Sequence, residues 1–243
     1  GQHGLDPYSA MTSDVYQDVF NEGSFTGKGL LHVATLHAVL GQRLPAECVL
    51  SHDLIEGALA RCAVVTDVTL IEAEPVHADV AAARLHRWTR GDWQLLPFLL
   101  RPGPWALSGI NRWKIADNLR RSLVVPASLL LIVLAMFGQG LSLPVALWLG
   151  AAARAAAPLL GAFAGSVPRR LSLVGERFLR GAITSLARAL AVGAWHLVLL
   201  PQQALLVTDA AWRTLYRLGV SQRRLLEWTT ADAAGAAHDR RLL

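Results

Sequence analysis

The sequence is poor in cysteine and in charge. Of its 243 residues only Cys48 and Cys62 are cysteines, and 17% are charged. Two cysteines without a zinc-type spacing exclude a disulfide framework and a zinc-finger module, so we expect both to be ordinary core residues. The low charge, with 53% hydrophobic residues and a mean hydropathy of +0.37, also excludes a disordered or solvating chain.

Acidic residues become scarce in the second part of the chain. Residues 1–100 hold 12 acidic and 6 basic side chains, whereas residues 101–243 hold 6 acidic and 17 basic ones. This asymmetry predicts a soluble module followed by a membrane module. The basic residues flank apolar runs and do not line a polar face, so the pI near 9.9 favours a lipid bilayer as partner and no nucleic acid.

The start of the chain is not typical of a complete secreted or membrane protein. Residue 1 is Gly1, and the residues that follow lack the basic and apolar regions of a signal peptide. We therefore expect a piece of a longer protein, with further domains of the same parent chain upstream and downstream.

No charged residue occurs in the 32 positions between Arg121 and Arg154. A helix needs ~20 mostly apolar residues to cross a bilayer, and glycines and a proline interrupt this run near residue 140. The run therefore predicts two spans, about 119–137 and 143–165, joined by a tight turn. Basic residues precede and follow the pair, which by the positive-inside rule puts both ends in the cytoplasm.

Two features complicate the membrane prediction. Arg154 falls near the middle of the second span, where a charge costs ~2.5–3.5 kcal/mol, so either it faces a polar neighbour or the span ends earlier. A third apolar stretch, 189–207, has basic residues on both flanks. It is consistent with a third span or with an interfacial or re-entrant helix pair.

The soluble part mixes short helical and strand patterns. Its longest helical pattern covers 79–100, and the valines and threonine of 63–72 predict a strand. Three glycines within seven positions mark a loop over 21–29. Shorter helices are predicted over 13–20, 30–40 and 54–61.

Ser51-His52-Asp53-Leu54-Ile55-Glu56-Gly57 is the first candidate site. Three adjacent residues cannot form a serine-hydrolase triad, because those partners must converge from separate segments. Asp53 followed three places later by Glu56 is typical of a capping box that opens a helix. The functional alternative is a carboxylate that faces a pocket and acts as a general base.

The second candidate site is the run from Arg84 to Gln94. At helical spacing Arg84, Arg87, Trp88 and Gly91 share one face. Guanidinium groups beside an indole suit a diphosphate and a sugar ring, since arginine binds phosphate oxygens through paired donors. The alternative is a basic helix that lies against phospholipid headgroups.

The glycine loop 21–29 is a weaker candidate. Lys28 and the surrounding glycines could hold a phosphate group, but the loop lacks the ending of a Walker A sequence. Most loops of this composition are turns.

Taken in order, these segments resemble the processive, membrane-embedded glycosyltransferases of the cellulose-synthase-like class. Ser51-His52-Asp53 stands where that class has its acidic base motif. Arg84-Leu85-His86-Arg87-Trp88 stands where it has a Q-x-x-R-W helix, with Arg84 in place of the frequent Gln. Within the class the chain is most similar to the cyclic β-1,2-glucan synthases, glycosyltransferase family 84. The similar stretches are 12–18, 22–29, 51–57, 86–94, 112–123 and 225–230.

The resemblance implies a fold and a location. The fold class would be α/β plus membrane α-helices. Residues 1–105 would form the C-terminal part of a cytoplasmic GT-A-type catalytic domain. Residues 106–170 would form an interfacial helix and a two-helix transmembrane hairpin, and 171–243 basic interfacial or re-entrant helices. The protein would be a multi-pass protein of the bacterial inner membrane.

The resemblance also implies a reaction. A membrane-bound inverting glucosyltransferase would transfer glucose from UDP-glucose to a growing β-1,2-glucan acceptor. A periplasmic osmoregulated β-glucan glucosyltransferase of different linkage and a non-catalytic membrane scaffold are the alternatives. The catalytic base would be Asp53, the donor diphosphate would be bound by Arg87, Arg84 and Lys28, and the acceptor by Trp88, Glu56 and Phe25.

The chain departs from the family in one important respect. Family members bind a divalent cation, Mg or Mn, through a D-x-D motif upstream of these segments, and no D-x-D occurs here. We therefore assign no metal ligand within this chain. A phosphorylase-like domain that follows in full-length members is also absent, so we expect the chain to be inactive by itself.

Overall fold

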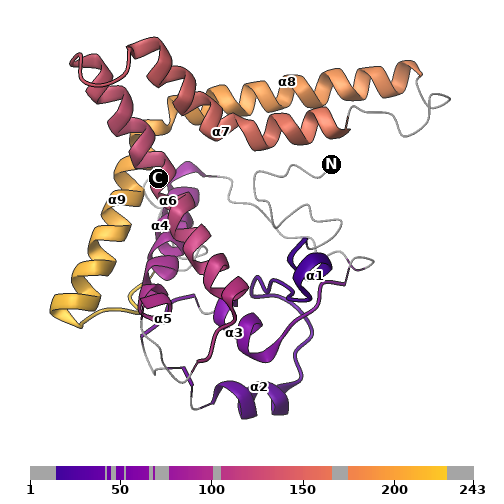
Figure 1. Cartoon of the computed structure of the whole chain (residues 1–243), viewed down its shortest axis with the longest axis vertical. Coiled ribbons are helices and arrows are strands. Elements are labelled where there is room, and N and C mark those ends of the chain that lie inside the picture. The colour runs from indigo at the N-terminus through magenta and orange to yellow at the C-terminus, as the bar shows by residue number, and fades with distance from the viewer. Residues whose placement is uncertain are drawn as a thin grey trace, which may run out of the picture. The chain divides into compact units, whose positions relative to one another are not determined.

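The part of the chain that the structure describes is helical. In the computed structural model these residues are 15–41, 43–44, 48–51, 53–65, 68, 77–100, 105–165 and 175–228. They form helices and connecting segments, and no strand occurs among them (Figure 1). Most of the strand expected over 63–72 lies outside the described residues, and 63–65 are irregular. Long apolar helices of the kind that the predicted fold class requires are present, whereas its α/β part is not seen in the described residues.

The chain divides into two compact units. Among the described residues, one unit comprises those of 15–122 and 206–228, and the other those of 123–205. We call them the site unit and the apolar unit. The boundaries fall inside two helices, α6 (Gly109–Met136) and α9 (Leu200–Tyr216).

Short helices make up the first part of the site unit. The predicted helix over 79–100 is divided at Leu95, because Pro97 has no N–H to continue the hydrogen-bond ladder. The expected helix over 13–20 is described only from Val15 onward. The helices are α1 (Val15–Phe20), α2 (Val33–Leu40), α3 (Asp53–Ala60), α4 (Ala78–Gln94) and α5 (Leu96–Leu100).

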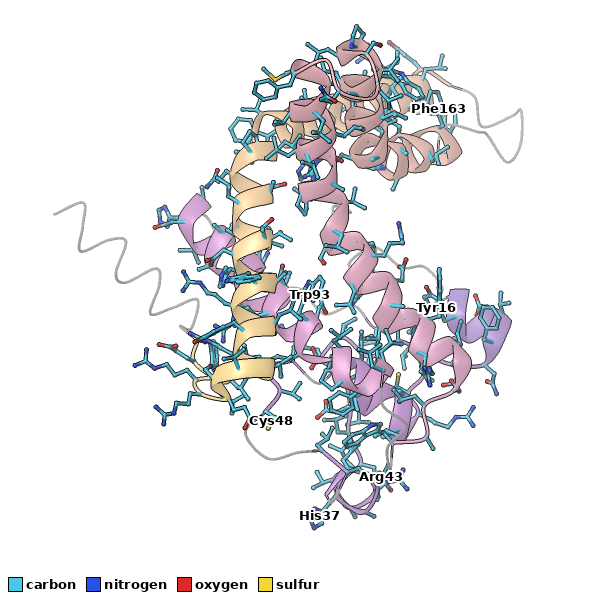
Figure 2. The ribbon with its side chains drawn as sticks, turned by 60° about the vertical axis from the view of Figure 1, so that its left-hand side comes forward. Tyr16, His37, Arg43, Cys48, Trp93 and Phe163 are labelled. Atoms are coloured by element: carbon cyan, nitrogen blue, oxygen red, sulfur yellow. The ribbon has the colours of Figure 1, made fainter. Side chains whose placement is uncertain are left out.

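The core of the site unit joins α3, α5 and the first half of α6. Its buried members are Ile55, Leu95, Phe98, Ile115 and Leu119. Trp93 packs against this cluster and donates from Nε1 to Ser122 Oγ at 3.0 Å (Figure 2). Burial of such side chains stabilises the unit by ~1.5–3 kcal/mol each, so α3 is held firmly where Ile55 enters the core.

A buried lysine ties the glycine loop to α6. Lys114, only 4% exposed, donates from Nζ to the backbone carbonyls of Glu22 at 2.9 Å and Gly23 at 2.7 Å. Asn111 donates to Glu22 Oε2 at 3.3 Å. A buried ammonium requires such acceptors, so the start of the loop is fixed.

Among the residues that the structure describes, three helices are long and apolar enough to cross a membrane: 109–136, 143–163 and 178–198. The two predicted spans lie in α6 and in α7 (Leu143–Gly165), although α6 begins ten residues earlier than the predicted span. Gly138 (φ +70°) and Gly140 (φ +74°) make the turn between them, in a backbone conformation that favours glycine.

The third apolar stretch differs from the prediction. It is not one element over 189–207, because it is divided at Leu199 between α8 (Glu176–Val198) and α9. The third long apolar helix therefore lies earlier, over 178–198. Exposed side chains such as Phe163 (Figure 2) and Trp195 leave the apolar faces of α7 and α8 uncovered. Uncovered faces of this kind fit a membrane protein.

Arg154 faces polar neighbours within the apolar unit. Its Nη2 donates to His196 Nδ1 at 2.9 Å and to Gln203 Oε1 at 2.5 Å. α7 packs on α8, and a Cβ on Gly193 would lie 3.2 Å from the Ala155 side chain. Arg154 therefore lies beside the last turn of α8, where the helix dipole favours a cation. Of the two alternatives from the sequence, the polar neighbour is the one observed.

Candidate functional site

Asp53 lies at the start of α3 and faces the glycine loop. Gly27 has φ +87°, and a Cβ placed on it would lie 3.0 Å from Asp53 Oδ2. Only glycine combines this backbone conformation with so close an approach. The structure therefore brings together two of the three predicted candidate segments. Lys28 is exposed on the same turn.

The position of Asp53 within α3 can be compared with the alternative from the sequence, in which Asp53 and Glu56 only form a capping box. The helix begins at Asp53, so Asp53 and Glu56 both belong to its first turn. Carboxylates there interact favourably with the helix dipole. That benefit is available to any acidic residue in the first turn, and it does not require the close approach of Gly27.

Phe25 packs against the second turn of α3. A Cβ on Gly57 would lie 2.7 Å from the Phe25 Cβ atom, which no side chain could tolerate without movement. Glu56, the neighbour of Gly57, is half-buried. Of the two predicted acceptor residues, Phe25 thus lies in the contact between the loop and α3.

The segment before α3 is held by α4. A Cβ on Gly91 would lie 2.7 Å from Ser51 Cβ, so the α4 backbone touches this segment directly. Ser51 donates from Oγ to Asp53 Oδ2 at 3.4 Å, and Leu50 donates its backbone N–H to Gln94 Oε1 at 2.6 Å. Gly91 therefore allows a close approach to the α4 backbone, and the approaching group is Ser51.

The arginine and tryptophan side chains of α4 do not pair as their order in the sequence suggests. Arg84 stacks over Trp88 with its Cζ 4.8 Å from the ring centroid. Arg87 stacks instead over Trp228, at 4.9 Å. Trp88 stays 43% exposed. Gly91 is one helical turn from Arg87, a rise of ~6 Å.

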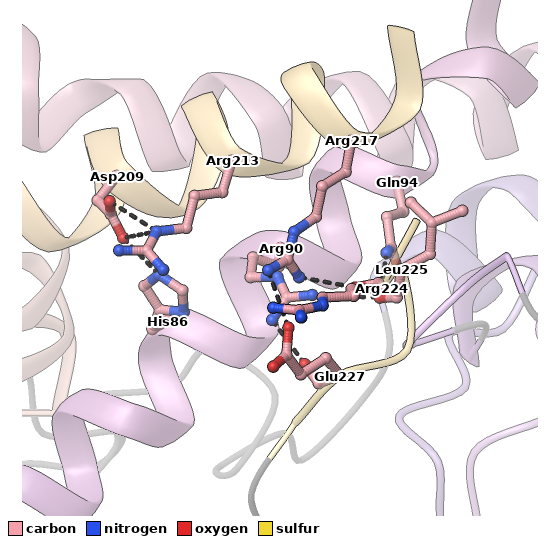
Figure 3. Close-up of polar contacts among 9 residues, drawn as sticks. All are labelled: His86, Arg90, Gln94, Asp209, Arg213, Arg217, Arg224, Leu225 and Glu227. Atoms are coloured by element: carbon pink, nitrogen blue, oxygen red, sulfur yellow. Dashed lines mark hydrogen bonds and ion pairs between the residues drawn. The ribbon is translucent and has the colours of Figure 1, made fainter. Parts of the chain in front are cut away.

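The C-terminal segment that carries Trp228 is anchored to α4 (Figure 3). Arg90 donates to the carbonyls of Glu227 at 2.7 Å and Leu225 at 3.2 Å, and Gln94 Nε2 donates to the Leu225 carbonyl at 2.9 Å. Arg217 pairs with the Glu227 carboxylate at 2.9 Å. Burial, with the charge of Arg217, lowers the pKa of Arg90. Arg90 and Gln94 therefore position Trp228 against Arg87.

A second contact joins α4 to α9 (Figure 3). His86 Nε2 lies 2.9 Å from Asp209 Oδ2, and Arg213 reaches the same carboxylate at 2.7 Å. Burial opposes ionisation of Asp209, but hydrogen bonds from Arg213 and His86 outweigh it and lower its pKa. His86, the third residue of the R-L-H-R-W motif, thus holds α4 against α9.

Asp92 is a residue that the sequence reading did not single out. Part of the residue reaches solvent, but its carboxyl group is enclosed, and burial raises its pKa to about 6 against the effects of Asn118 and Arg121. Asn118 Nδ2 donates to Asp92 Oδ1 at 3.2 Å. The charge of Asp53 raises the pKa of Asp92 further. The available signal in the sequence was an acidic residue next to Gly91.

The described residues bring together no group of three or more His, Cys, Asp or Glu side chains that could hold a metal ion. The divalent cation implied by the family resemblance has no ligand set in this part of the chain. We therefore assign the proposed chemistry only to residues of this chain.

The chain is similar to one segment of a known enzyme. It is 44% identical over 236 residues to the cyclic β-(1,2)-glucan synthase NdvB of Rhizobium meliloti (strain 1021), a match that includes 96% of this chain. The expected resemblance to the cyclic β-1,2-glucan synthases is confirmed. The chain spans about 8% of the length of that relative. No protein-family profile matches the chain.

The structure places the glycine loop beside Asp53, Arg84 over Trp88 and Arg87 over Trp228. That Asp53, Arg87 and Trp88 line one cleft stays a prediction. The roles of all these residues belong to the proposal that follows.

Proposed function

We propose that the chain is part of a membrane-bound inverting glucosyltransferase that transfers glucose from UDP-glucose to the 2-hydroxyl of a growing β-1,2-glucan. The observation that carries the proposal is the 44% identity to the Rhizobium glucan synthase over nearly the whole chain. The arrangement of Asp53 beside the glycine loop supports it, because Gly27 of the loop and the Ser51 hydroxyl both approach the carboxylate.

The proposed chemistry is a single displacement. An α-linked donor that gives a β-linked product requires inversion, and hence one base. The acceptor hydroxyl gives its proton to Asp53 while its oxygen attacks the anomeric carbon. The bond from that carbon to the diphosphate breaks, and its electron pair leaves with UDP. A positioned base of this kind contributes ~10²–10⁴-fold to the rate.

The charge that develops on the leaving diphosphate needs cationic partners. We assign this role to Arg87 and Arg84 on α4, with Lys28 on the glycine loop as a third contact. Fixed donors are effective here because they need no reorganisation during the reaction. Both guanidinium groups already lie over indole rings, which limits their freedom before the substrate binds.

The acceptor sugar requires a flat apolar surface and polar groups at its edge. The exposed face of Trp88 supplies the surface, and Phe25 and Glu56 are assigned to the next part of the acceptor path. An indole ring suits a sugar because it presents a rigid apolar plate. Stacking would hold the glucan end in place while its hydroxyl reacts.

The long apolar helices support a membrane location for this chemistry. Among the described residues three helices have sufficient length and hydropathy, and together with the basic residues around the first two they favour a multi-pass protein of the bacterial inner membrane with the site unit in the cytoplasm. We propose that the site unit completes a GT-A-type domain whose nucleotide- and metal-binding parts come from other residues of the parent protein.

The test is Asp53→Asn in the full-length protein. Membranes that contain it are incubated with radiolabelled UDP-glucose, and the linkage of the product is determined. We expect the wild-type protein to make a 1,2-linked glucan and the variant to lose ~10²-fold or more of the rate. Asp18→Asn changes an exposed carboxylate on α1 and serves as the matched control.

Three outcomes would contradict the proposal. Unchanged glucan synthesis by the Asp53→Asn variant would show that Asp53 is not the catalytic base. A product of another linkage would identify a different β-glucan glucosyltransferase. If the wild-type protein transfers no glucose, the non-catalytic membrane scaffold is the alternative that remains. Membrane insertion of each variant is measured in parallel, since loss of a helix-opening residue alone costs ~1 kcal/mol.

A further inference from the structure

One face of α4 holds the C-terminal segment that carries Trp228. Arg87, Arg90 and Gln94 lie on this face at helical spacing. Arg90 and Gln94, which are 6% and 2% exposed, donate to backbone carbonyls of the segment (Figure 3). Arg87 lies over the Trp228 ring, with its Cζ 4.9 Å from the ring centroid. The two buried side chains therefore fix the backbone next to the indole that Arg87 contacts.

The segment has a second anchor besides α4. Arg217 donates from Nη1 to the Arg224 carbonyl at 2.6 Å and pairs through Nη2 with the Glu227 carboxylate at 2.9 Å. Trp228 follows Glu227 directly and is itself 51% exposed. An indole this exposed is not part of a hydrophobic core. The ring contact that the structure describes for it is the Arg87 guanidinium.

The stack leaves the hydrogen-bonding edge of Arg87 open. A guanidinium stacks on a ring through its face, whereas its N–H donors point outward in its plane, where they bind phosphate oxygens in pairs. Arg90 uses both of its Nη atoms on backbone carbonyls. Within the part of the chain that the structure describes, no acceptor is hydrogen-bonded to Arg87. Of these two arginines on one face, Arg87 is thus the one with donors to offer a ligand.

We propose that Trp228 is a positioning residue for the donor substrate: its ring holds the Arg87 guanidinium with the N–H edge free for the diphosphate of UDP-glucose. The proposal rests on the proposed function, in which Arg87 binds that diphosphate. An arginine side chain has many rotamers, and ordering it costs free energy. When the guanidinium is ordered before the substrate binds, that cost no longer opposes binding or the stabilisation of charge on the leaving group.

The test compares Trp228→Leu with Trp228→Phe in the full-length protein. Both new side chains are apolar and smaller than tryptophan, but only phenylalanine keeps a π face for the guanidinium. In Trp228→Leu we expect kcat/KM for UDP-glucose to fall about fivefold and the inhibition constant of UDP to rise about fivefold. Trp228→Phe should stay within about twofold of the wild type. Inhibition by uridine, which has no phosphate, should be unchanged in both variants.

A double-mutant cycle and a matched control belong to the same experiment. Once Arg87→Ala has removed the guanidinium, Trp228→Leu should cause no further loss, because its effect passes through Arg87. Trp113→Leu is the control, since Trp113 on α6 is 52% exposed, close to the value for Trp228. It is expected to follow the wild type. All rates are divided by the amount of protein in the membrane.

An unchanged inhibition constant of UDP in Trp228→Leu would overturn the inference. Equal losses in Trp228→Leu and Trp228→Phe, or in Trp228→Leu and Trp113→Leu, would also overturn it, as would additive losses in the double variant. Equal weakening of uridine and UDP would indicate that the ring only maintains the structure. Failure of the proposed function is separate, since there the wild-type protein makes no 1,2-linked glucan.

Discussion

Replacement of Asp92 by Asn is expected to stabilise the site unit at neutral pH. The raised pKa of Asp92, about 6 compared with an ordinary 3.8, means that its ionised form is disfavoured by the fold. The difference corresponds to about 3 kcal/mol, and this is an upper value because part of the residue reaches solvent. Asn118 can still donate to the amide oxygen of the variant, so the hydrogen bond is kept.

The sign of the pH dependence follows from the two pKa values. Below pH 3.8 the carboxyl is protonated in the folded and the unfolded chain, so folding buries no charge at Asp92. Between pH 3.8 and about 6 the unfolded chain loses its proton first, so the folded state is progressively destabilised. Above about pH 6 the full cost is present. Asp92→Asn should therefore have no stabilising effect near pH 3.5 and its largest effect at pH 7–8.

Hydrogen–deuterium exchange of the full-length protein measures this locally. Peptides from α4 and from the first half of α6 are compared between wild type and variant at each pH, so that the intrinsic pH dependence of exchange cancels. At pH 7.5 the slowest amides should exchange up to about 100-fold more slowly in the variant. Asp18→Asn on α1 provides the control. A variant that is less protected at pH 7.5, or equally changed at both pH values, would refute the reasoning.

Two further predictions concern the contacts of each unit. Gly91→Ala places a Cβ 2.7 Å from Ser51 Cβ and should cost ~1–3 kcal/mol of stability, with faster amide exchange around Ser51 and reduced glucan synthesis; unchanged exchange would mean that α4 does not hold this segment. Arg154→Leu should make membrane insertion of 143–163 more favourable by ~2.5–3.5 kcal/mol in a glycosylation-based insertion assay. Equal insertion of the two sequences would show that α7 does not place this residue in the hydrocarbon region.

The largest features of the fold could be predicted from the sequence because they depend on local pattern. The uncharged run between Arg121 and Arg154 predicts long apolar helices, and α6 and α7 are found there. Helices near 30–40 and 54–61 were also predicted, and α2 and α3 occupy these positions. The division of 79–100 at Leu95 was missed, although Pro97 was visible in the sequence and supplies its cause.

The site was predictable only in part. Asp53, Arg87 and Trp88 are candidates because of a resemblance to a family. Such a resemblance depends on the order and spacing of residues along the chain. The stack of Arg87 on Trp228 was not predictable in this way, because 141 positions separate the two residues. It depends on Arg90, which was visible within the R-W-T-R-G-D-W run but had no recognised partner.

The sequence alone determined where the apolar helices lie, where the glycine loop stands and which motif carries a carboxylate, since hydropathy, glycine content and short motifs are local properties. Tertiary structure alone decided the surroundings of a second carboxyl group, that of Asp92. Asp92 is an ordinary acidic residue in the sequence, and only the packing of the helices encloses its carboxyl group and brings it to Asn118. The environment of an ionisable group is set by residues distant along the chain, and for that reason its proton affinity is a property of the fold.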